Sequence, residues 1–465
     1  MSIARREFLR SGFALAATAA AECGCSDLSL HLPPRPSGGW DDVPAILARV
    51  VPPEFPDRDF IVTDYGAVGD GEVDCYPAFA AAIAACNKAG GGRVVVPGPD
   101  KNYRLNGPIH LLSNVNLYLE AGSVVLFGSH AADYLPPVLI RYQGIRCYNY
   151  SPLIYAYQQT NIAVTGEGTI DGQAYDWAAW EKLANPDWAA LLKMVANGVP
   201  VEQRVFGAGH HLRLTMFEPY ECTNVLVQGV TFTGSPFWTL HPVFCTNVTI
   251  ADVTVLPGES NDDGCDPDSC TDVLVEDCTF TTNDDNVSVK AGYGADAVGL
   301  SPCQNIVFQN CNLVRSDWGG ITIGSQTGSI VQNVFVQNCR LGKCSYAYFL
   351  KSNSETGGAI KNVFIRSSTV SECAIFFRVL PNFDFASGPM PPLFININLE
   401  DMQCGKASIA AFLIDGDARN PIVYITLTDI AIAVAKAVQQ VESAFFITSD
   451  NVTVDGHQVA VGGSL

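Results

Sequence analysis

The chain has 465 residues, of which 48% are hydrophobic and 16% charged, a composition that supports a large apolar core and not a disordered or collagen-like chain. Its 47 acidic residues outnumber the 27 basic ones, which gives a formal net charge of −20. Because no basic surface could dominate such a molecule, the charge argues against nucleic acid or an anionic membrane as a partner.

The N-terminus has the pattern of an export signal. The basic segment ARREFLR, residues 4–10, precedes the apolar small-residue run SGFALAATAAA, residues 11–21. A twin-arginine pair followed by a short apolar stretch resembles the signal of the twin-arginine (Tat) export pathway. We therefore expect residues 1–25 to direct the chain out of a bacterial cytoplasm, into the periplasm or the extracellular space.

Two cysteines near the end of this signal offer a second way to anchor the chain. Cys23 or Cys25 could carry a lipid, but Glu22 makes the sequence AAEC a poor lipidation site. No other segment is long and apolar enough to predict a membrane span. Residues 26–58 predict a linker because Pro and Gly cluster in them, and residues 59–465 predict a single catalytic domain.

Two segments of the predicted domain have helical character. Residues 75–92, CYPAFAAAIAACNKAGGG, end in glycines and predict a helix that covers the open end of a stack of repeats. Residues 175–198 predict a second helix that interrupts a series of strands. We expect its Trp177, Trp180 and Trp188 to serve packing, with a lid beside a cleft as the alternative.

The remaining sequence repeats a short strand motif, in which an Asn or Asp precedes alternating apolar residues. This alternation is typical of a strand with one buried face. Units of this length without a recurring helix predict an all-β fold, a right-handed parallel β-helix (solenoid) with an N-terminal capping helix and a short helical insertion. A β-propeller is the alternative, but its blades need about 40 residues each. Clear copies begin at residues 224, 247, 272, 305, 333 and 362.

Seven of the sixteen cysteines follow the same repeat. Equal phase on successive coils predicts stacked ladders in the core, where a free Cys behaves as a small hydrophobic residue. Folding in the reducing cytosol before export also favours thiols, so we expect mainly free thiols, with disulfides between neighbouring coils as the alternative. Four cysteines precede a landmark residue by two positions and three follow one by six: Cys222, Cys245, Cys270 and Cys303, then Cys278, Cys311 and Cys339.

Two acidic doublets lie one repeat apart, in SNDDGCDPDSC (residues 260–270) and TNDDNVSVKAG (residues 282–292). Residues of equal phase on adjacent coils of a parallel β-helix lie about 4.8 Å apart. The spacing therefore predicts that Asp263 and Asp285 form one row, which Trp318 and Lys351 continue on later coils. Crowding raises the pKa of one carboxyl, which can then act as a general acid. Carboxyls about 6.5–9.5 Å apart would leave room for the water of an inverting glycosidase.

Two other interpretations of the doublets stay open. Asn and Asp are common in turns and could have no further role. Alternatively, the acidic side chains could form a calcium site, as pectate lyases have on a similar stack, although Arg315, the nearest candidate for a lyase base, has the wrong phase. The candidate ligands are Asp262, Asp263, Asp266, Asp268, Asp284 and Asp285.

The doublets and their surroundings resemble the motifs of glycoside hydrolase family 28, the polygalacturonase family. NDDGCDPDSC is similar to the family's Asn-Thr-Asp-Gly-x-Asp motif, and NDDNVSVKAG to its Gly-Asp-Asp motif with a trailing Lys. SPFWTLHPVFCTNVTI, residues 235–250, is similar to the preceding segment of bacterial members. DFIVTDYGAVGDG, residues 59–71, and GGGRVVVPG, residues 90–98, resemble the start of pectin-active β-helices. The resemblance extends from about residue 59 to about residue 351.

The resemblance implies a role for each matching residue. Asp284 would be the general acid that protonates the glycosidic oxygen, while Asp263 and Asp285 would activate water. Lys351 matches the Lys of the family's Arg-Ile-Lys motif, which binds the carboxylate of the sugar. Family members invert the anomeric centre without a metal or an organic cofactor. The candidate substrate-binding residues are Lys351, Lys290, Trp318, Asn261 and Gln326.

Four positions depart from the family pattern. The His of Gly-His-Gly is replaced in DWGG by Trp318, and the Arg of Arg-Ile-Lys is Phe349. Gln326 stands in place of a Glu, and Asn283 in place of a Gly. Because Lys cannot replace the bidentate contact of an Arg with a carboxylate, homogalacturonan is in doubt as the substrate. Trp318 offers a sugar ring a stacking surface, with packing as its alternative role.

The leading hypothesis is an exported, monomeric glycoside hydrolase that cleaves a pectic or related polysaccharide without a cofactor. A calcium-dependent polysaccharide lyase is the second hypothesis, since it would use the acidic cluster to bind the metal. The third is a β-helix that binds carbohydrate without catalysis, with the missing His and Arg as traces of lost activity. The presence of all three family carboxylates favours hydrolysis.

Overall fold

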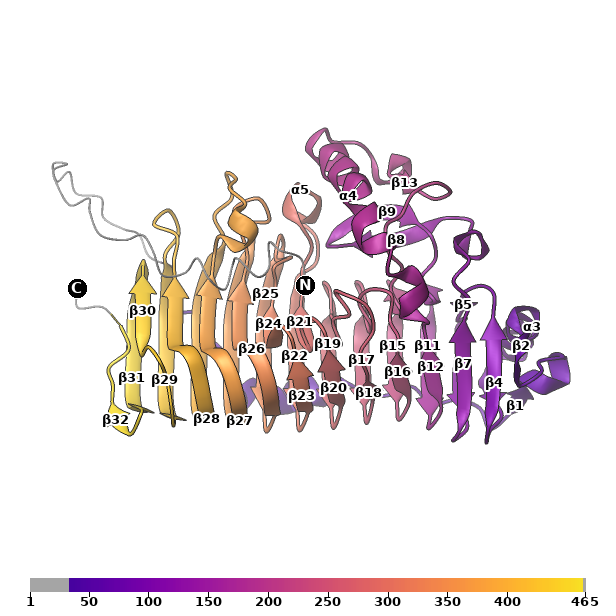
Figure 1. Cartoon of the computed structure of the whole chain (residues 1–465), viewed down its shortest axis with the longest axis horizontal. Coiled ribbons are helices and arrows are strands. Elements are labelled where there is room, and N and C mark those ends of the chain that lie inside the picture. Colours follow the sequence, from indigo (N-terminus) through magenta and orange to yellow (C-terminus); the bar gives the residue numbers. More distant parts are fainter. Residues whose placement is uncertain (1–32, 463–465) are drawn as a thin grey trace. The chain divides into compact units, whose positions relative to one another are not determined.

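The computed structural model describes residues 33–462, so the predicted signal and its two cysteines lie outside the described residues. The chain divides into an N-terminal unit that ends at Arg35 and a compact unit that begins at Pro36. In the compact unit, nearly all strand pairs are parallel, and successive coils of the chain stack on one another (Figure 1). This arrangement confirms the predicted right-handed parallel β-helix.

The first column of stacked strands carries the landmark residues of the sequence repeat, and we call it the Asn column. Register pairs such as Val225 with Val248 and Val248 with Val273 place the apolar positions of one coil directly on those of the next. Its strands are β1 (Asp59–Ile61), β3 (Gly92–Val96), β6 (Val115–Leu119), β11 (Thr160–Gly166), β15 (Thr223–Gln228), β17 (Thr246–Ala251), β19 (Thr271–Glu276), β22 (Cys303–Gln309), β25 (Ile330–Gln337), β27 (Ala359–Leu380), β28 (Leu393–Asp415), β29 (Ile422–Ile432) and β31 (Ala444–Val454).

A second column follows the first around each coil. Strands β26, β27 and β28 are long enough to pair with neighbours in more than one column. The second column contains β2 (Asp70–Asp74), β4 (Lys101–Leu105), β7 (Ser123–Phe127), β12 (Thr169–Asp171), β16 (Thr231–Thr233), β18 (Thr254–Val255), β20 (Thr279–Thr282), β23 (Asn312–Ser316) and β26 (Arg340–Lys351).

The third column, which we call the site column, carries the acidic doublets. Between its strands β14 and β21, single bridges continue the parallel pairing from Phe217 through Leu240 and Cys265 to Val287. Its strands are β5 (Ile109–His110), β10 (Ile154–Tyr157), β14 (Phe217–Tyr220), β21 (Val287–Val289), β24 (Gly319–Ile323) and β30 (Gln439–Glu442), together with parts of β26, β27 and β28.

The landmark positions adopt a left-handed backbone conformation, with φ near +58° at both Asn224 and Asn247. Asn tolerates this conformation better than other non-glycine residues. Its side-chain amide also donates a hydrogen bond to the landmark residue of the previous coil, for example from Asn333 to Asn305 over 3.1 Å. The landmark residues therefore form a ladder along the stack, which explains why the repeat needs Asn at this position.

The core lies inside the coils and consists of the inward apolar side chains of all three columns. Burying one Val, Leu or Ile contributes about 1.5–3 kcal/mol, so a continuous core of this size stabilises the stack strongly. The predicted cysteine ladders lie in this core: Cys245, for example, is 1% exposed, and its backbone N–H lies 3.3 Å from the sulfur of Cys270. The cysteines of residues 33–462 are all free thiols.

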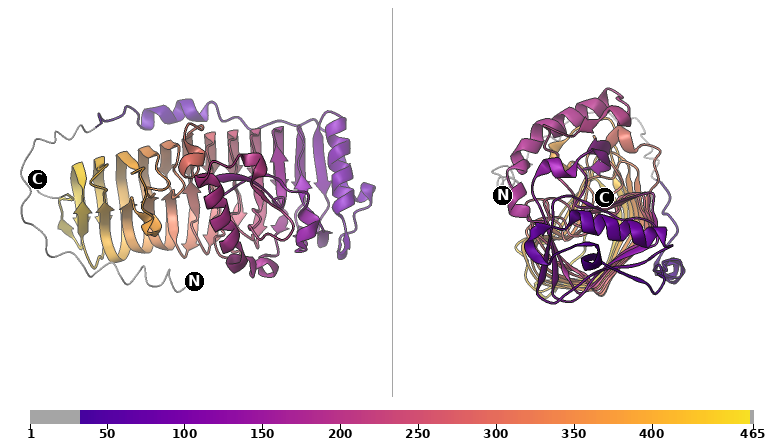
Figure 2. Two further views of the ribbon diagram at one scale, coloured as in Figure 1. Left: turned by 90° about the horizontal axis from the view of Figure 1, so that it is seen from above. Right: turned by 90° about the vertical axis from the view of Figure 1, so that its right-hand side faces the viewer.

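Both predicted helices are present. The capping helix α3 (Tyr76–Lys88) lies across one end of the stack, where Phe79 and Ile83 join the core (Figure 2). The insertion lies on the outside of the stack, on the side of β15 and β17 (Figure 1). It contains η4 (Ala131–Tyr134), β8 (Val138–Tyr142), β9 (Ile145–Asn149), η5 (Ala174–Trp177), α4 (Trp180–Ala196), η6 (Val201–Gln203) and β13 (Val205–Phe206).

The insertion packs on the coils through a second apolar cluster, to which both contribute side chains, for example Tyr142 of β8 and Tyr220 of β14. Trp177 is 2% exposed and Trp188 packs against Tyr142, with ring centroids 6.0 Å apart, in line with the packing role expected for these tryptophans. Strands β8 and β9 form an antiparallel hairpin whose turn contains Gly144. The short helix α5 (Gly294–Ala297) of the main stack contacts both α4 and β9.

Residues 36–51 follow the outside of the stack and include η2 (Trp40–Asp42) and α2 (Val43–Leu47) (Figure 2). They fill a gap in the Asn ladder, because Asp272 has no amide to donate to Asn247. Arg49 pairs with Asp272 over 2.7 Å, and the backbone N–H of Val51 donates to Asn247 over 2.9 Å. We call residues 36–51 the strap.

The remaining elements are short: η3 (Val62–Tyr65), η7 (Phe383–Phe385) and β32 (His457–Gln458). Across residues 33–462, no helix combines the length and the apolar character that a bilayer crossing requires.

Candidate active site

Three carboxylates meet at the edge of the site column. Asp263 lies two residues before the bridge at Cys265, and Asp284 and Asp285 lie just before β21 on the next coil. One oxygen from each of the three carboxylates lies within 4.8 Å of the others. Their exposed fractions are between 1% and 4%. The parallel register therefore brings the two doublets together, as their phase predicts.

Asp284 is fixed by its neighbours in the turn. The side-chain amide of Asn261 donates to Asp284 Oδ2 over 2.9 Å, and Arg213 in turn donates to Asn261 Oδ1 over 2.7 Å. The guanidinium of Arg213 also packs over the ring of Phe237, 4.5 Å from its centroid. The backbone N–H of Asp284 donates to Asp262 Oδ1 over 3.0 Å. Asn261, predicted to bind substrate, thus has its amide directed at a carboxylate of the row.

Asp285 is held by one charged and one neutral donor. Lys351 Nζ lies 2.9 Å from Asp285 Oδ2, and the backbone N–H of Gly319 donates to Asp285 Oδ1 over 2.9 Å. A Cβ atom at Gly319 would lie only 2.5 Å from Asp285 Oδ1 and 2.1 Å from the hydroxyl of Thr322. Glycine is therefore required at this position for the main chain to approach the carboxylate.

Asp263 shares a lysine with a second carboxyl. Lys290 Nζ lies 3.2 Å from Asp263 Oδ2 and 3.6 Å from Asp266 Oδ1. The same ammonium group lies 4.2 Å from the ring centroid of Trp238, which is a cation–π contact. Lys290, which was expected to contact substrate, is 2% exposed and in this structure contacts the carboxylate row.

The electrostatics of the row follow from burial and crowding. Burial raises the pKa of Asp263 to about 7; Lys290 opposes this increase, while Asp284 and Asp285 add to it. Burial also raises the pKa of Asp285 in spite of Lys351. For Lys290, burial favours the neutral amine, but Asp266 and Asp263 outweigh it and raise its pKa. The row can therefore hold both a proton and a negative charge near neutral pH, as acid–base catalysis requires.

One expectation about the geometry differs from the structure. Inverting glycosidases typically hold their two carboxyls about 6.5–9.5 Å apart. Here the nearest oxygens of the three carboxylates lie within 4.8 Å. The strands place them on adjacent rungs, and Lys290 and Lys351 offset part of the repulsion. The spacing alone therefore does not predict inversion.

An aromatic wall surrounds the ammonium group of Lys351. The rings of Phe383, Phe349 and Trp318 lie 4.8, 5.2 and 6.0 Å from Lys351 Nζ. Trp318 is 6% exposed and packs edge-on against Tyr346. Trp318 and Phe349, which depart from the family pattern, therefore form part of the environment of this lysine.

Gln326 lies away from the carboxylate row. Its backbone carbonyl accepts a hydrogen bond from Ala291, and its side chain lies under the turn of the insertion hairpin, where a Cβ at Gly144 would meet Gln326 Cγ at 2.9 Å. Its Oε1 atom is buried and has no hydrogen-bond partner among the residues described. The structure places this predicted substrate-binding residue where the insertion meets the stack.

The six acidic residues considered as calcium ligands do not form one group. Asp262 accepts backbone N–H groups from Gly258, Asn283 and Asp284, so it organises the turns. Asp268 pairs with Arg141 over 3.0 Å. Within residues 33–462, the group whose oxygens could share one cation is limited to the three carboxylates of the row, and two of these already contact lysines.

Sequence reasoning missed several residues that support the site. Arg213 lies in a segment without the strand repeat, and Arg141 belongs to the insertion hairpin. His241 lies within the segment SPFWTLHPVFCTNVTI, whose likeness to bacterial members implies no role for the histidine. Glu218, on β14, has no motif of its own. These charges are buried because the insertion packs on the stacked coils, which no local pattern of the sequence predicts.

Comparisons with known proteins show the family to which the chain is related. The model of the family described as Glycosyl hydrolases family 28 matches residues 214–444, a segment that contains the whole carboxylate row. The crystal structure of an exopolygalacturonase from Thermotoga maritima is 34% identical in sequence. The match covers 88% of this chain and 96% of that chain, with a TM-score of 0.81.

Curated relatives match over a shorter region. A probable polygalacturonase of Vitis vinifera is 28% identical over 288 residues, which are 59% of this chain and 52% of that protein. An exo-poly-alpha-D-galacturonosidase of Dickeya chrysanthemi is 27% identical over 303 residues, which are 60% of this chain and 49% of that protein. The chain thus spans about half the length of the curated relatives it matches.

Proposed function

This chain belongs to glycosyl hydrolase family 28, and from that membership we propose that it is an exported enzyme that hydrolyses glycosidic bonds in a pectic or related polysaccharide. The observation that carries the proposal is the meeting of Asp263, Asp284 and Asp285 from adjacent coils within 4.8 Å. Hydrolysis of a glycosidic bond needs a proton donor and a base for water, and this row supplies carboxyls for both.

We assign the proton transfer to Asp284, which gives its proton to the glycosidic oxygen as the bond to the anomeric carbon breaks. Asp263 and Asp285 orient the attacking water and accept its proton, so one water molecule is consumed and the row regains its charge. Burial raises the pKa of Asp263 to about 7, so the three carboxyls together can hold one proton near neutral pH, and the reactive form is the one in which this proton is on the donor while Asp263 is free to accept from water. Asn261 and Gly319 direct N–H groups at the row and keep its carboxyls in place.

Inversion of the anomeric centre is part of the proposal because the chain belongs to this family, and the spacing of the carboxyls does not decide it. If the water attacks from the face opposite the leaving oxygen, the first product carries the inverted configuration. Proton NMR of the product within the first minutes of reaction, before mutarotation, would reveal the initial anomer. Retention would contradict the assignment of Asp263 and Asp285 to water.

We propose that the substrate contains uronic acid and that part of the protein's binding site for it is aromatic. Lys351 and Lys290 supply positive charge next to the row, and Lys351 lies among the rings of Phe349, Phe383 and Trp318. Phe349 provides no bidentate contact to a carboxylate, so the sugar beside it need not be a uronate. Because the net charge is −20, moderate salt should help a polyanionic substrate approach.

We further propose exo action, because the insertion covers the site column on one side of the row. Its hairpin β8–β9 lies over Glu218 and Asp268, which belong to the coils of β14 and of the first doublet. A covered column leaves a polysaccharide chain one direction in which to extend. The solved structure that is 34% identical is named an exopolygalacturonase, which supports the same conclusion.

The second candidate, a calcium-dependent lyase, is favoured by one observation, the ability of the three carboxylates to share a cation. Lys290 and Lys351 oppose it, since their ammonium groups contact the oxygens that a metal would use.

Export by the twin-arginine route rests on residues 1–25 and would be tested by fusing this segment to a reporter. Replacement of Arg5 and Arg6 by Lys should retain the reporter in the cytoplasm.

One experiment separates these functions. Homogalacturonan, rhamnogalacturonan and xylogalacturonan are incubated with the protein, with and without a chelator, and products are followed by reducing-end assay, near-ultraviolet absorbance and chromatography. Hydrolysis by exo action predicts reducing ends without absorbance, in chelator as well, with monosaccharide or short products from the first time points. Absorbing products that disappear in chelator would establish the lyase. Retention of a polysaccharide without any product would indicate a binding protein.

A further inference from the structure

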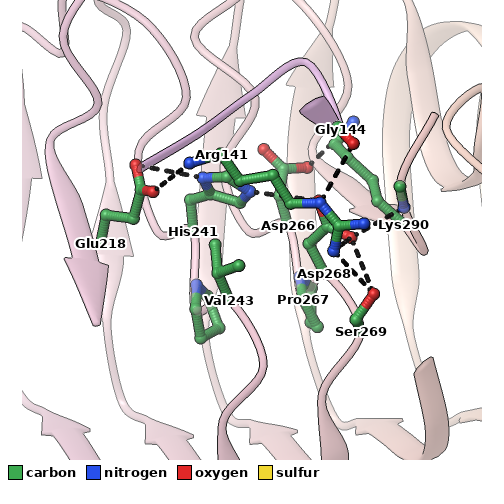
Figure 3. Close-up of polar contacts among 12 residues, drawn as sticks. Arg141, Gly144, Glu218, His241, Val243, Asp266, Pro267, Asp268, Ser269 and Lys290 are labelled. Carbon is green, nitrogen blue, oxygen red and sulfur yellow. Dashed lines mark hydrogen bonds and ion pairs between the residues drawn. The ribbon is translucent and has the colours of Figure 1, made fainter. Parts of the chain in front are cut away.

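A second buried charged cluster lies on the same column near Lys290 (Figure 3), the lysine that contacts Asp263 of the carboxylate row. It comprises Glu218 of β14, His241, Asp268 and Arg141 of β8, and the proposed reaction uses none of them directly. The side chains of all four are 0% exposed. Buried charges are costly unless they are paired, so the cluster requires an explanation.

The ring of His241 lies between two carboxylates. Its Nδ1 is 3.5 Å from Glu218 Oε2, and its Nε2 is 3.6 Å from Asp268 Oδ2. On the other side, Arg141 Nη1 contacts Asp268 Oδ1 over 3.0 Å, and the backbone N–H of Arg141 donates to Glu218 Oε1 over 2.9 Å. Each carboxylate therefore uses one oxygen for Arg141 and directs the other at the imidazole.

The protonation state of His241 follows from this geometry. A neutral imidazole has one N–H group, so either tautomer would direct a nitrogen lone pair at a carboxylate oxygen. Among residues 33–462, neither the two oxygens that face the ring, on Glu218 and Asp268, nor the two ring nitrogens of His241 have a hydrogen-bond partner, and the contacts of 3.5 and 3.6 Å between them are ion-pair distances. An imidazolium ion, with an N–H on each nitrogen, matches both carboxylates.

The cluster is connected to the row through two contacts of Lys290. The edge of His241 packs against Trp238, with ring centroids 4.8 Å apart, and the ammonium group of Lys290 lies over the same indole. Asp268 Oδ1 also accepts the backbone N–H of Gly292, two residues after Lys290, over 3.1 Å. Whatever holds Trp238 and Asp268 in place therefore also holds Lys290 against Asp263.

We propose that His241 is a positioning residue that remains an imidazolium throughout the working pH range, fixes Asp268 and Trp238, and through them keeps Lys290 beside Asp263. The same ion anchors the insertion hairpin, because Arg141 and the imidazolium share the two carboxylates. The catalytic part of this inference rests on the proposed function. The charge state of His241 and the anchoring of the insertion hairpin are independent of the proposed function.

The other charged groups near His241 are consistent with this state. Burial favours a neutral ring, but the contacts with Asp268 and Glu218 outweigh it and raise the pKa of His241. Burial opposes ionisation of Asp268 too, yet Arg141 and His241 hold its pKa below the usual value. The remaining titratable groups around the cluster, whose pKa values burial raises above their usual values, are Asp266, Cys147, Tyr155 and Tyr220.

The charge state can be measured without any substrate. In protein labelled with ¹⁵N at histidine, both ring nitrogens of His241 should keep the signature of N–H donors from pH 5 to pH 8. The signal is assigned by its loss in His241→Gln, and independently by its selective shift in Glu218→Gln, which should still fold. A single titration step near the ordinary histidine pKa of about 6.5 would overturn the proposal.

The positioning role is tested by kinetics at several pH values. His241→Gln should lower kcat about 10- to 100-fold with a smaller change in KM, since small displacements at a site are that costly. In the pH profile of His241→Gln, the alkaline limb should move to higher pH. The reason is that a displaced Lys290 lowers the pKa of Asp263 less than in the wild type. The double variant Glu218→Gln/His241→Gln, which restores the charge balance, should recover at least part of kcat.

A matched control distinguishes this role from a general loss of structure. His210, whose Nδ1 lies 2.7 Å from Asp187 on the insertion, has a side chain that is 43% exposed, and His210→Gln should leave kcat and the pH profile unchanged. A wild-type pH profile in folded His241→Gln would overturn the positioning role. If the wild-type protein cleaves no polysaccharide, the proposed function fails, while the ¹⁵N result still decides the charge state.

Discussion

The carboxylate row and the cluster around His241 are built from the same coils, yet their charges are arranged in opposite ways. In the row, Asp263, Asp284 and Asp285 crowd like charges together, and the pKa of Asp263 rises to about 7. In the cluster, Asp268 lies between Arg141 and His241, and its pKa is lowered. Both sets are almost fully buried, so burial alone does not determine whether a buried acid stays ionised.

The difference lies in what each carboxylate faces. Asp266 and Asp268 are two residues apart, yet the pKa of Asp266 is raised well above its usual value while that of Asp268 is lowered. Burial is the largest influence on both, but Asp268 has a guanidinium and an imidazole next to it, whereas Asp266 shares Lys290 with Asp263. Asp263 and Asp266 share one cation, Lys290, and their pKa values are raised, so this pair can hold a proton near neutral pH. Asp268 lies between two cationic groups and stays ionised, which suits a structural role.

The largest effect is expected from Asp284→Asn. This change removes the proposed proton donor and should lower kcat about 10²- to 10⁴-fold. The thermal midpoint should stay nearly unchanged, because the relief of repulsion in the row offsets the loss of one of the two hydrogen bonds that Asp284 accepts, from Asn261 and from the backbone N–H of Asp285. Steady-state kinetics and calorimetry check both expectations. Asp317→Asn, at an exposed acid near the site, is the matched control, and full activity of Asp284→Asn would remove the general-acid assignment.

Mutations in the cluster around His241 should instead lower the free energy of unfolding. Arg141→Met leaves Asp268 and Glu218 with less positive charge in a buried site, and breaking such a pair costs about 3–5 kcal/mol of unfolding free energy. Urea unfolding at pH 7 measures the loss. Lys406→Met removes a pair with Glu372 in which both side chains are more than two-fifths exposed, and it should cost about 1 kcal/mol or less. Equal losses in the two variants would contradict the comparison.

The sequence was sufficient for the features that depend on the repeat. Asn224, Asn247 and their successors have the same phase, so the strands, the core and the meeting of the two doublets could be predicted from spacing alone. Within a doublet the spacing was less informative. Asp262 accepts backbone N–H groups in the turn while Asp263 faces the row, whereas both acids of the second doublet belong to the row.

The features missed from the sequence depend on segments outside the repeat. Arg141 and Gly144 reach the site column only because the insertion hairpin folds over it, and no phase within the coils predicts that docking. The motif makes Gln326 a candidate for substrate binding, but it does not predict that this side chain lies against the hairpin turn at Gly144. The spacing typical of inverting glycosidases does not describe this row either, because residues of equal phase on adjacent rungs bring their carboxylate oxygens within 4.8 Å.

The pH dependence of activity sharpens the electrostatic side of the comparison. Because catalysis needs a proton on the row, kcat/KM should fall about tenfold per pH unit above roughly pH 7, where Asp263 loses its proton. Lys290 lowers the pKa of Asp263, so removing the lysine raises it. Lys290→Met should therefore move the alkaline limb to higher pH, even though the maximal rate falls. An alkaline limb at the same pH as in the wild type, or at a lower pH, would contradict the coupling between Lys290 and Asp263.

The smallest effect is expected where a charge pair is partly exposed, at the contact between Arg49 of the strap and Asp272 of the Asn column. The side chain of Arg49 is 47% exposed, so Arg49→Met should cost less than about 1 kcal/mol at pH 7. Burial would raise the pKa of Asp272, but its hydrogen bonds from Arg49 and Asn305 lower it. A lowered carboxyl pKa stabilises the fold above the usual value and loses this contribution as pH falls through the folded value. The difference between the variant and the wild type, measured by urea unfolding, should therefore vanish in acid, and a difference that persisted at low pH would mean that Arg49 acts by packing.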